Sequence, residues 1–414
     1  MPFLYTLSVY IYTCFIKLVS LANPKARQWV KGRKGIFVRM GSEILADDQI
    51  IWIHCASLGE FEQGRPVIEA LKQRYPAYKI MLTFFSPSGY EVRKNYENAD
   101  YVFYLPADAP ANAKKFVDII RPKLAVFIKY EYWFNYIRAL HRNNIPVFMA
   151  SAVFRKKQHF FKWYGKWFLN QLKKIEWFFL QQTRDKELLA DFGIRNASVS
   201  GDTRFDRVLK IREEQEEIPL IEKFVQHKKV FLAGSSWSPD EKIVRAFMAK
   251  EPTDFKYIVA PHQVHEDHIR EIVNLFGAVR VARMSALETA DLESCKVLII
   301  DSIGFLSRLY RYAGYALIGG GFGVGIHNIL EASAFGVPVF FGPNYQKFEE
   351  AKDLIRLGGA FEIDGPEALT AKVNAFESNP EAYQHCRENA QVYVRDKQGA
   401  TNRILHKLSA YLQG

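Results

Sequence analysis

The sequence predicts an α/β protein built from two doubly wound, Rossmann-like domains, with an N-terminal membrane anchor. From Gln49 onward, apolar strands alternate with amphipathic helices, the pattern of parallel sheets covered by helices on both faces. The alternation stops at a charged stretch after Asp206 and then restarts. The chain has 414 residues, a length that suits two domains better than one core.

The N-terminal segment differs in kind from the rest of the chain. Residues 3–16 are almost wholly apolar, and basic residues crowd the stretch that ends at Lys34. A basic leader and a small-residue cleavage site are missing, so we expect an anchor and not a removed signal peptide. The length leaves open a span, an interfacial helix and a core helix of the first domain. We assign residues 1–34 to the anchor and its basic flank, which puts the next domain on the cytoplasmic side.

The first Rossmann-like domain is expected over residues 35–206, where short apolar runs are the strand candidates. They are IIWIHC, KIMLTFF, YVFYLP, LAVFIKY, PVFMAS and WFFLQQ, with helices between them over 66–74, 111–121 and 134–142. The charged, strandless residues 207–228 are interpreted as the linker.

The second Rossmann-like domain is expected over residues 229–414. Its strand candidates are KVFLAGSS, YIVAP, VLIID, YALIGG and VPVFFG. The terminal helical run, residues 366–412, is long enough to pack back on the first domain. Because ligands of doubly wound sheets bind at the carboxyl ends of strands, the expected site is a central cleft that the two domains face.

A glycine-rich segment stands out in the second domain. A strand candidate, residues 316–318, is followed by five glycines within residues 319–325 and by a predicted helix over 327–335. Glycine N–H groups next to a helix N-terminus can bind a phosphate, so Gly320 and Gly321 are candidate ligand residues. A tight turn that only packs a helix on the sheet is the alternative.

The net charge of +11 and the pI near 9.2 indicate an anionic partner, either nucleic acid, acidic lipid or a phosphorylated substrate. The sequence lacks RNA-binding and helix-turn-helix signatures, which disfavours nucleic acid. Four cysteines without paired spacing fit a reducing compartment. The run His262, His265 and His268 does not have the spacing of a helical metal pair, so we expect no metal site.

Two glutamates follow buried strands of the first domain. Glu60 lies in SLGEFEQG, between a strand and a helix, and Glu131 follows LAVFI. A carboxylate at a strand's carboxyl end can take the proton from an attacking sugar hydroxyl. The alternatives are a helix-capping carboxylate at Glu60 and, at Glu131, a buried ion pair or an aromatic-lined wall.

Several motifs occur in a defined order along the chain. They are the opening apolar stretch, HCASLGEFEQG, KYEYWFN, GDTRFD, AGSSWSPDE and DSIGFLSRLY. In this order they resemble 3-deoxy-D-manno-octulosonic acid (Kdo) transferases, the lipid A Kdo transferase family with the GT-B fold. The resemblance covers nearly the whole chain. It implies an inverting glycosyltransferase that moves Kdo from CMP-Kdo to a lipid A precursor, lipid IVA, on the cytoplasmic face of the inner membrane.

The resemblance also implies roles for individual residues. Glu60 matches the catalytic base, and Glu131 matches a residue that acts in the transition state with the basic residue of the G-x-x-K-F-D motif. That basic residue is Arg204 here, so a planar guanidinium replaces a compact ammonium.

Three segments of the second domain match those through which the family binds CMP. The matching residues are Pro261, His262, Ile303, Gly304, Phe305, Asn328, Ile329, Leu330 and Glu331. Many relatives have Pro-Arg where this chain has Pro-His, so a phosphate-binding arginine is replaced by His262. Asn328 and Glu331 lie three residues apart, on one face of a helix, where they can hold a ligand's hydroxyls.

Two further features concern the ligands. The Ser235 hydroxyl follows a strand and can meet a phosphate or a sugar, although a turn-forming serine fits equally. An Asp-x-Asp metal motif is absent from the sequence, and a leaving CMP can be stabilised by backbone N–H groups. We therefore expect no cofactor beside the donor CMP-Kdo.

Residues 155–168, RKKQHFFKWYGKWF, interleave basic and aromatic side chains. The pattern suits a lipid-facing surface, base stacking or an amphipathic helix packed on the sheet. With the anchor on the same domain, we favour a surface that faces an anionic membrane.

Two other functions remain open from the sequence. One is a GT-B transferase that uses a UDP- or GDP-sugar and another lipid acceptor. The second is a nonenzymatic peripheral membrane protein that senses a nucleotide.

Overall fold

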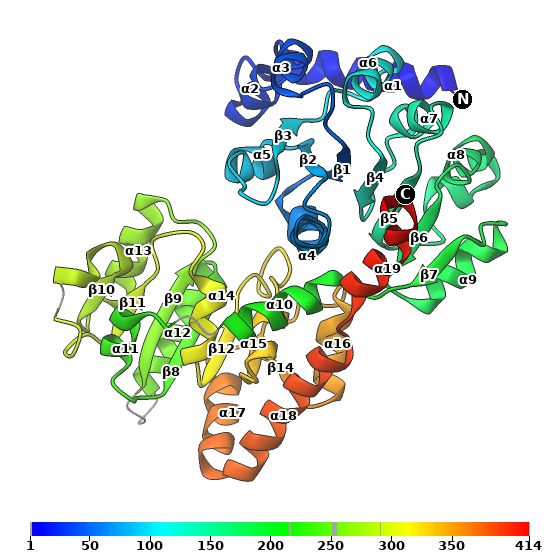
Figure 1. Cartoon of the computed structure of the whole chain (residues 1–414). Helices are drawn as coiled ribbons and strands as arrows, with labels where there is room; N and C mark the ends of the chain where they lie inside the picture. The colour runs from blue at the N-terminus through cyan, green and yellow to red at the C-terminus, as the bar shows by residue number, and fades with distance from the viewer. Residues whose placement is uncertain (1, 215–216, 251–254, 290, 414) are drawn as a thin grey trace. The chain divides into compact units, whose positions relative to one another are not determined.

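The computed structural model describes residues 2–413 apart from 215–216, 251–254 and 290. The chain forms two compact units (Figure 1). The first contains residues 1–207 and 398–414, and the second contains residues 208–397. Each unit has its own seven-stranded sheet, and every strand pairing is parallel. The predicted α/β class with two doubly wound sheets is confirmed.

The first sheet has the strand order β3-β2-β1-β4-β5-β6-β7. Its strands are β1 Ile50–Cys55, β2 Lys79–Phe84, β3 Tyr101–Tyr104, β4 Leu124–Ile128, β5 Val147–Ala152, β6 Trp177–Leu180 and β7 Ala197–Val199. All residues of β1 are buried, because helices cover both faces of the sheet. Trp52 packs into the core on one face, whereas Ile51 and Ile53 pack into the core on the other.

The helices of the first unit follow the strands in alternation. They are α4 Leu58–Arg74, α5 Pro87–Arg93, α6 Pro110–Ile120, α7 Phe134–Arg142, α8 Lys166–Leu172 and α9 Thr183–Asp191, with the 3₁₀ turns η1 His159–Phe161 and η2 Trp163–Gly165. The last helix of the chain, α19 (Ala400–Leu412), packs against α4 and adds Ile404, Leu405 and Leu408 to the core.

Three helices precede the first strand: α1 Pro2–Val19, α2 Pro24–Lys31 and α3 Ile36–Glu43. Figure 1 shows α1, in dark blue, running past α6 and α7. None of its residues is buried. Among the described residues it is the one helix long and apolar enough to cross a membrane. Tyr5 attaches it to the unit, since its ring lies 5.2 Å from that of Phe134 and its hydroxyl donates to Asp108 (2.5 Å).

The second sheet has the order β10-β11-β9-β8-β12-β13-β14. Its strands are β8 Val230–Ser236, β9 Lys256–Pro261, β10 Val281–Arg283, β11 Val297–Ile299, β12 Tyr315–Ile318, β13 Val339–Phe341 and β14 Ala360–Glu362. Its helices are α11 Pro219–Val225, α12 Ser238–Lys250, α13 Glu266–Phe276, α14 Leu306–Leu309, α15 Leu330–Ala334, α16 Glu349–Arg356, α17 Pro366–Ser378 and α18 Pro380–Asp396, with the 3₁₀ turns η3 Met284–Thr289 and η4 Tyr310–Tyr312.

The expected linker over 207–228 is not a separate connection. Most of its described residues lie in α10 (Thr203–Glu214), within which the boundary between the units falls, and in α11. Ile221 and Phe224 of α11 are fully buried. Their spacing places both on one face of a helix, which the high charge of the stretch concealed.

The terminal helical run also divides differently from the expectation. Helices α17 and α18 belong to the second unit, and α19 alone belongs to the first. Gly399, at a φ of +94°, separates α18 from α19. The Asp206 carboxylate accepts hydrogen bonds from the Gly399 N–H (2.5 Å), the Thr401 N–H (2.7 Å) and the Thr401 hydroxyl (2.7 Å). This capping stabilises the start of α19 on the first unit.

Candidate functional site

Glu60 lies in the first turn of α4, directly after the carboxyl end of β1. Ser57 precedes the helix in an extended conformation, and its hydroxyl donates a hydrogen bond to the Glu60 carboxylate. The spacing Ser-x-x-Glu is that of a capping box. In that motif the side chains bond backbone N–H groups, whereas here they bond each other. The half-buried carboxylate is thereby oriented by a neighbouring hydroxyl.

Glu131 follows the adjacent strand β4. Lys129, at a φ of +67°, turns the chain out of the strand. The Glu131 side chain is 13% exposed, and its Oε2 lies 3.6 Å from Nε2 of His54, which is buried on β1. Strands β1 and β4 are paired in the sheet. Their pairing therefore brings a histidine and a carboxylate together at one edge.

His54 is part of a hydrogen-bond network that the sequence did not indicate. The Trp133 indole N–H donates to Nε2 (2.8 Å), and Nδ1 lies 2.8 Å from the Thr83 hydroxyl, which also accepts from Trp52 (2.8 Å). An indole N–H is only a donor, so Nε2 must be the acceptor and Nδ1 carries the proton. In this arrangement His54 is neutral and its orientation is determined on both sides.

Arg204, in the first turn of α10, forms a close pair with Asp202. Its Nε and Nη2 lie 2.9 and 2.8 Å from one carboxylate oxygen, and its backbone N–H donates to the other (2.9 Å). Tyr130 links this arginine to the glutamates. Burial raises the pKa of Tyr130, the Glu60 charge adds to that increase, and Arg204 opposes it. Glu60 and Arg204 therefore both lie near Tyr130, the residue before Glu131 in the chain.

An aromatic cavity of about 670 Å³ includes Glu131 in its wall. The other lining residues are Tyr5, Ala56, Phe85, Tyr130, Tyr132, Trp133, Phe134, His159 and Phe168. The carboxylate of Glu131 is the one acidic group among them. A cavity of this size can take a sugar ring or part of a lipid, with the acid at its wall to contact hydroxyl groups.

The glycine-rich segment of the second unit is followed by a shorter helix than the sequence predicted. Helix α15 begins at Leu330 and has five residues, so the prediction of a helix from His327 is wrong. The loop before it folds onto itself and onto its neighbours, through bonds from Gly325 N to Gly320 O (2.9 Å) and from Ile326 N to Asn344 O (3.3 Å). These bonds hold residues 326–329 outside the helix. The N-terminus of the helix therefore lies at Leu330, three residues after the predicted start.

The N–H of Gly320 is already engaged by a carboxylate. It donates to Oδ2 of Asp240 (3.0 Å), which also accepts from the Trp237 N–H (2.9 Å). Gly321 approaches the backbone of Gly342 so closely that a Cβ would clash with it. Both glycines thus have a packing role of the kind that the tight-turn alternative describes.

Asn328 and Glu331 do lie together, as their spacing suggested. The Asn328 amide donates to Oε1 of Glu331 (2.9 Å), and its Oδ1 accepts from the Leu330 N–H (3.2 Å). Both side chains are half-buried. In contrast, Ile329 and Leu330 are buried, so their side chains support the pair.

Three rings stack close to these residues in the second unit. The ring centroid of His262 lies 4.4 Å from that of His327 and 4.8 Å from that of Trp237. The indole N–H of Trp237 donates a hydrogen bond to Nε2 of His327 (3.0 Å). Burial, and then the neighbouring His262, lower the pKa of His327 to about 4. Burial also lowers the pKa of His262. Both imidazoles are therefore neutral at pH 7, and His262 does not supply the positive charge of an arginine.

The remaining candidates lie in the same unit. Ser235, at a φ of +51°, is half-buried at the end of β8, and Pro261 ends β9. Ile303 is 77% exposed, and Gly304 has a φ of +101°. Phe305 precedes α14. Among the described residues, no three His, Cys, Asp or Glu side chains are grouped in a way that could hold a metal ion.

Comparisons with known proteins point to one family of transferases. A family model described as 3-deoxy-D-manno-octulosonic-acid transferase (kdotransferase) matches residues 30–207. The 3-deoxy-D-manno-octulosonic acid transferase of Haemophilus influenzae is 26% identical, over 97% of this chain and 95% of its own length. That of Aquifex aeolicus is 28% identical, over 78% and 84%. The chain is thus similar to Kdo transferases over most of its length, and residues 30–207 match their family model.

Comparison with solved structures supports the fold. A UDP-GlcNAc 2-epimerase from Neisseria meningitidis aligns with a TM-score of 0.62 at 17% identity, over 87% of this chain and 100% of its own. A glycosyltransferase from Rickettsia africae aligns with a TM-score of 0.57 at 14% identity, over 89% and 98%. The two doubly wound units are those of the GT-B fold.

The basic and aromatic stretch 155–168 divides between core and surface. Phe160 and Phe161 are buried in the core of the first unit, and Phe168 packs against it. The lipid-facing interpretation is therefore wrong for these side chains, because η1 and α8 direct them toward the core. Trp163, at 93% exposure, and Tyr164, at 45%, are the aromatic side chains of the stretch that lie on the surface.

Proposed function

We propose that this protein is a member of the Kdo transferase family, an inverting glycosyltransferase that moves Kdo from CMP-Kdo to a lipid A precursor, lipid IVA. One observation carries the proposal. In the segment that matches the family model, a carboxylate oriented by a serine hydroxyl, Glu60, follows β1, and a second carboxylate, Glu131, follows the paired strand β4.

Glu60 acts as the general base in this proposal. It takes the proton of the acceptor hydroxyl while that oxygen bonds to the anomeric carbon of Kdo. The bond between this carbon and the phosphate oxygen breaks, and CMP leaves with the electron pair. Attack from the face opposite the phosphate inverts the configuration. The Ser57 hydroxyl, which donates to the carboxylate, leaves the second carboxylate oxygen available to accept the proton.

Glu131 and Arg204 contribute charge around the reacting sugar. The Arg204 guanidinium can pair with the carboxylate of Kdo, and Glu131 can stabilise positive charge that develops at the anomeric carbon. His54 is a positioning residue. Its Nε2 lies 3.6 Å from Glu131, and the bonds to Thr83 and Trp133 hold it there.

The second unit binds the nucleotide in this proposal. The bonded pair of Asn328 and Glu331 offers an amide and a carboxylate for the ribose hydroxyls, and Ser235 and the 303–305 segment complete the donor site. His262, a neutral ring in the stack with Trp237 and His327, contacts the nucleotide as a hydrogen-bonding or stacking partner. Because the leaving group is a monophosphate, we propose no divalent metal.

The N-terminal helix supports a location of the protein at a membrane. Helix α1 exposes apolar side chains along its length and is long enough to cross a bilayer. We propose that it anchors the chain at the inner membrane, with both units on the cytoplasmic face, where basic flanking residues are found in membrane proteins.

Incubation of the purified protein with CMP-Kdo and lipid IVA tests the function. Mass spectrometry of the lipid should show the addition of Kdo, and NMR of the product should show the inverted linkage. UDP- and GDP-sugars in place of CMP-Kdo should give no product. Transfer from one of these donors, or full CMP affinity without any transfer, would contradict the proposal.

A further inference from the structure

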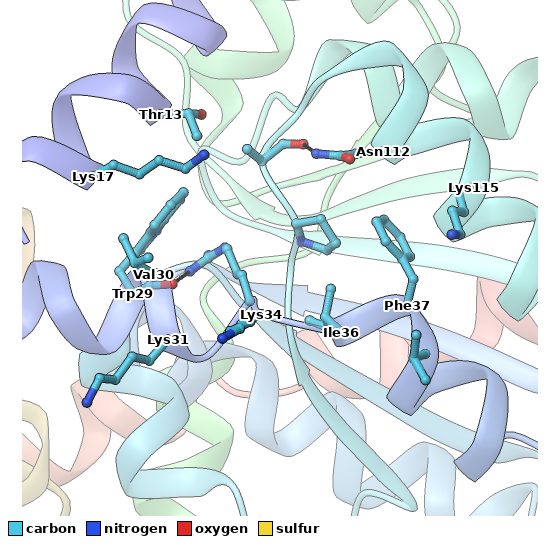
Figure 2. A pocket seen from close by; sticks show the side chains of 15 residues that line it. Thr13, Lys17, Trp29, Val30, Lys31, Lys34, Ile36, Phe37, Asn112 and Lys115 are labelled. Atoms are coloured by element: carbon cyan, nitrogen blue, oxygen red, sulfur yellow. Dashed lines mark hydrogen bonds between the residues drawn. The ribbon is translucent and has the colours of Figure 1, made fainter.

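A cavity beside the N-terminal helix lies apart from the residues discussed above. It has a volume of about 560 Å³, which is within the range of small-ligand sites. Helices α1, α2, α3 and α6 and the segments between α2 and α3 and before α6 contribute its walls. Figure 2 shows these walls, with Lys17 extending from α1 toward the middle of the view. The cavity therefore lies next to the candidate membrane helix.

The lining of this cavity is strongly basic. It includes four lysines, Lys17, Lys31, Lys34 and Lys115, and no aspartate or glutamate. Within the part of the chain that the structure describes, none of these ammonium groups is paired with a carboxylate. All four side chains are exposed. The net positive charge of the site is thus not neutralised by the protein itself.

A fifth cation, Arg33, is built into the wall. Its guanidinium donates to the backbone carbonyls of Phe85 (2.7 Å), Leu105 (2.8 Å) and Trp29 (3.0 Å), and it lies 3.8 Å from the centre of the Trp29 ring. Burial lowers the pKa of Arg33 to about 9. A cation held by carbonyls and rings raises the local positive potential, and this potential favours an anion in the cavity.

Exposed apolar side chains are found in the lining of the cavity and elsewhere on the helix beside it. Val38, which lines the cavity, is 78% exposed. On α1, which contributes Thr13 and Lys17 to the lining, Leu18 is 68% and Phe15 60% exposed. A small soluble anion would not contact these apolar side chains. A lipid would, because its acyl chains can lie along apolar side chains while its phosphate binds lysines.

We propose that this cavity binds the phosphate-bearing headgroup of an anionic membrane phospholipid. The lysines hold the phosphate, and the exposed side chains of α1 and Val38 contact the acyl chains. The site would fix how the first unit is oriented on the bilayer. Lipid binding at this cavity does not depend on sugar transfer, so it can be tested separately from the proposed function.

The test compares two double variants of the full chain with equal charge. Lys34→Gln with Lys115→Gln removes two cavity lysines, whereas Lys25→Gln with Lys123→Gln removes two exposed lysines outside the cavity. Lys17 stays, because its removal would make α1 more apolar. Binding to phosphatidylcholine vesicles that contain phosphatidylglycerol is measured by sedimentation, without any sugar donor or acceptor.

We expect the cavity pair to weaken binding roughly 25-fold, since each basic residue at an anionic surface contributes about a factor of five. The control pair should weaken it less than about five-fold, and Lys34→Arg with Lys115→Arg should retain binding. Melting temperatures check that every variant is folded, and the single variant Lys115→Gln replaces the pair if the pair is not.

Three results would overturn the proposal. An equal loss in the cavity pair and the control pair would show diffuse attraction to the surface. No loss in the cavity pair would show that the lysines do not contact lipid. Binding of soluble glycerol 3-phosphate by the wild type and not by the cavity pair, with no effect of glycerol 3-phosphate on vesicle binding, would assign the cavity to a soluble phosphate compound instead.

Discussion

The two sheets are both parallel, but the loops at their carboxyl edges carry opposite chemistry. At the edge of the first sheet, Glu60 and Glu131 present carboxylates that a serine and a histidine orient. At the edge of the second, the neutral rings of His262 and His327 stack, and an amide bonds a carboxylate between Asn328 and Glu331. The fold brings loops together at the carboxyl edge of each sheet. The residues of those loops decide whether the edge is suited to accept a proton or to bind a nucleotide.

The largest effect is expected at Glu60, where the comparison is sharpest. Glu60→Gln keeps the size of the side chain and its bond to Ser57 but cannot accept a proton, so kcat should fall roughly 10²–10⁴-fold. CMP affinity should stay near that of the wild type. Turnover, CMP affinity and melting temperature measured on one preparation decide the case. An active Glu60→Gln enzyme would refute the general base.

Substitutions at the carboxyl edge of the second sheet should weaken CMP binding. Asn328→Ala and Glu331→Ala should each weaken CMP binding by roughly 1–3 kcal/mol, the usual loss for hydrogen bonds to charged groups. Titration calorimetry with CMP measures this, and Glu60→Gln is the matched control from the first sheet. If both variants bind CMP as the wild type does, the ribose assignment is wrong.

The neutral ring stack predicts a pH dependence of stability. The pKa of His327 is about 4 in the folded chain, below the value of about 6.5 in an unfolded chain. The unfolded state therefore binds the proton first as the pH falls. Stability should be full above pH 6.5 and decrease between pH 6.5 and pH 4, by about 2 kcal/mol after allowance for partial exposure.

Urea unfolding at pH 7 and pH 4.5 checks this expectation. His327→Phe keeps a ring in the stack but has no proton to bind, so its stability should fall less over the same interval. Equal pH dependence in the wild type and His327→Phe would show that other groups cause the decrease.

The smallest effect concerns the orientation of His54. Trp133→Phe removes the indole donor to Nε2, so the His54 ring is held beside Glu131 from one side only. We expect a loss of about 1 kcal/mol in stability from the missing bond and a kcat lower than that of the wild type. An unchanged kcat at unchanged stability would make the network irrelevant to the site.

Local sequence was sufficient to predict the fully buried strands of the two sheets and the positions of the two candidate glutamates. The strands of parallel sheets are buried on both faces, so runs such as IIWIHC and LAVFI predict them without knowledge of their partners. The positions of Glu60 and Glu131 follow directly, because each comes after such a run. The edge strands β7, β10 and β14, with three residues each, were missed because each is only partly buried. The equally short strands β11 and β13 are buried throughout and were predicted.

Contacts between distant residues decided the rest. Trp133 and His54 are 79 residues apart, so no local pattern could reveal their bond or the tautomer that it determines. The Asn344 carbonyl holds Ile326 outside α15, which overrides a local helix signal. The stretch 155–168 has one composition, yet Phe160 is buried and Trp163 is exposed. Sequence periodicity records burial along one element, whereas these outcomes depend on which other elements provide donors, acceptors and packing surfaces.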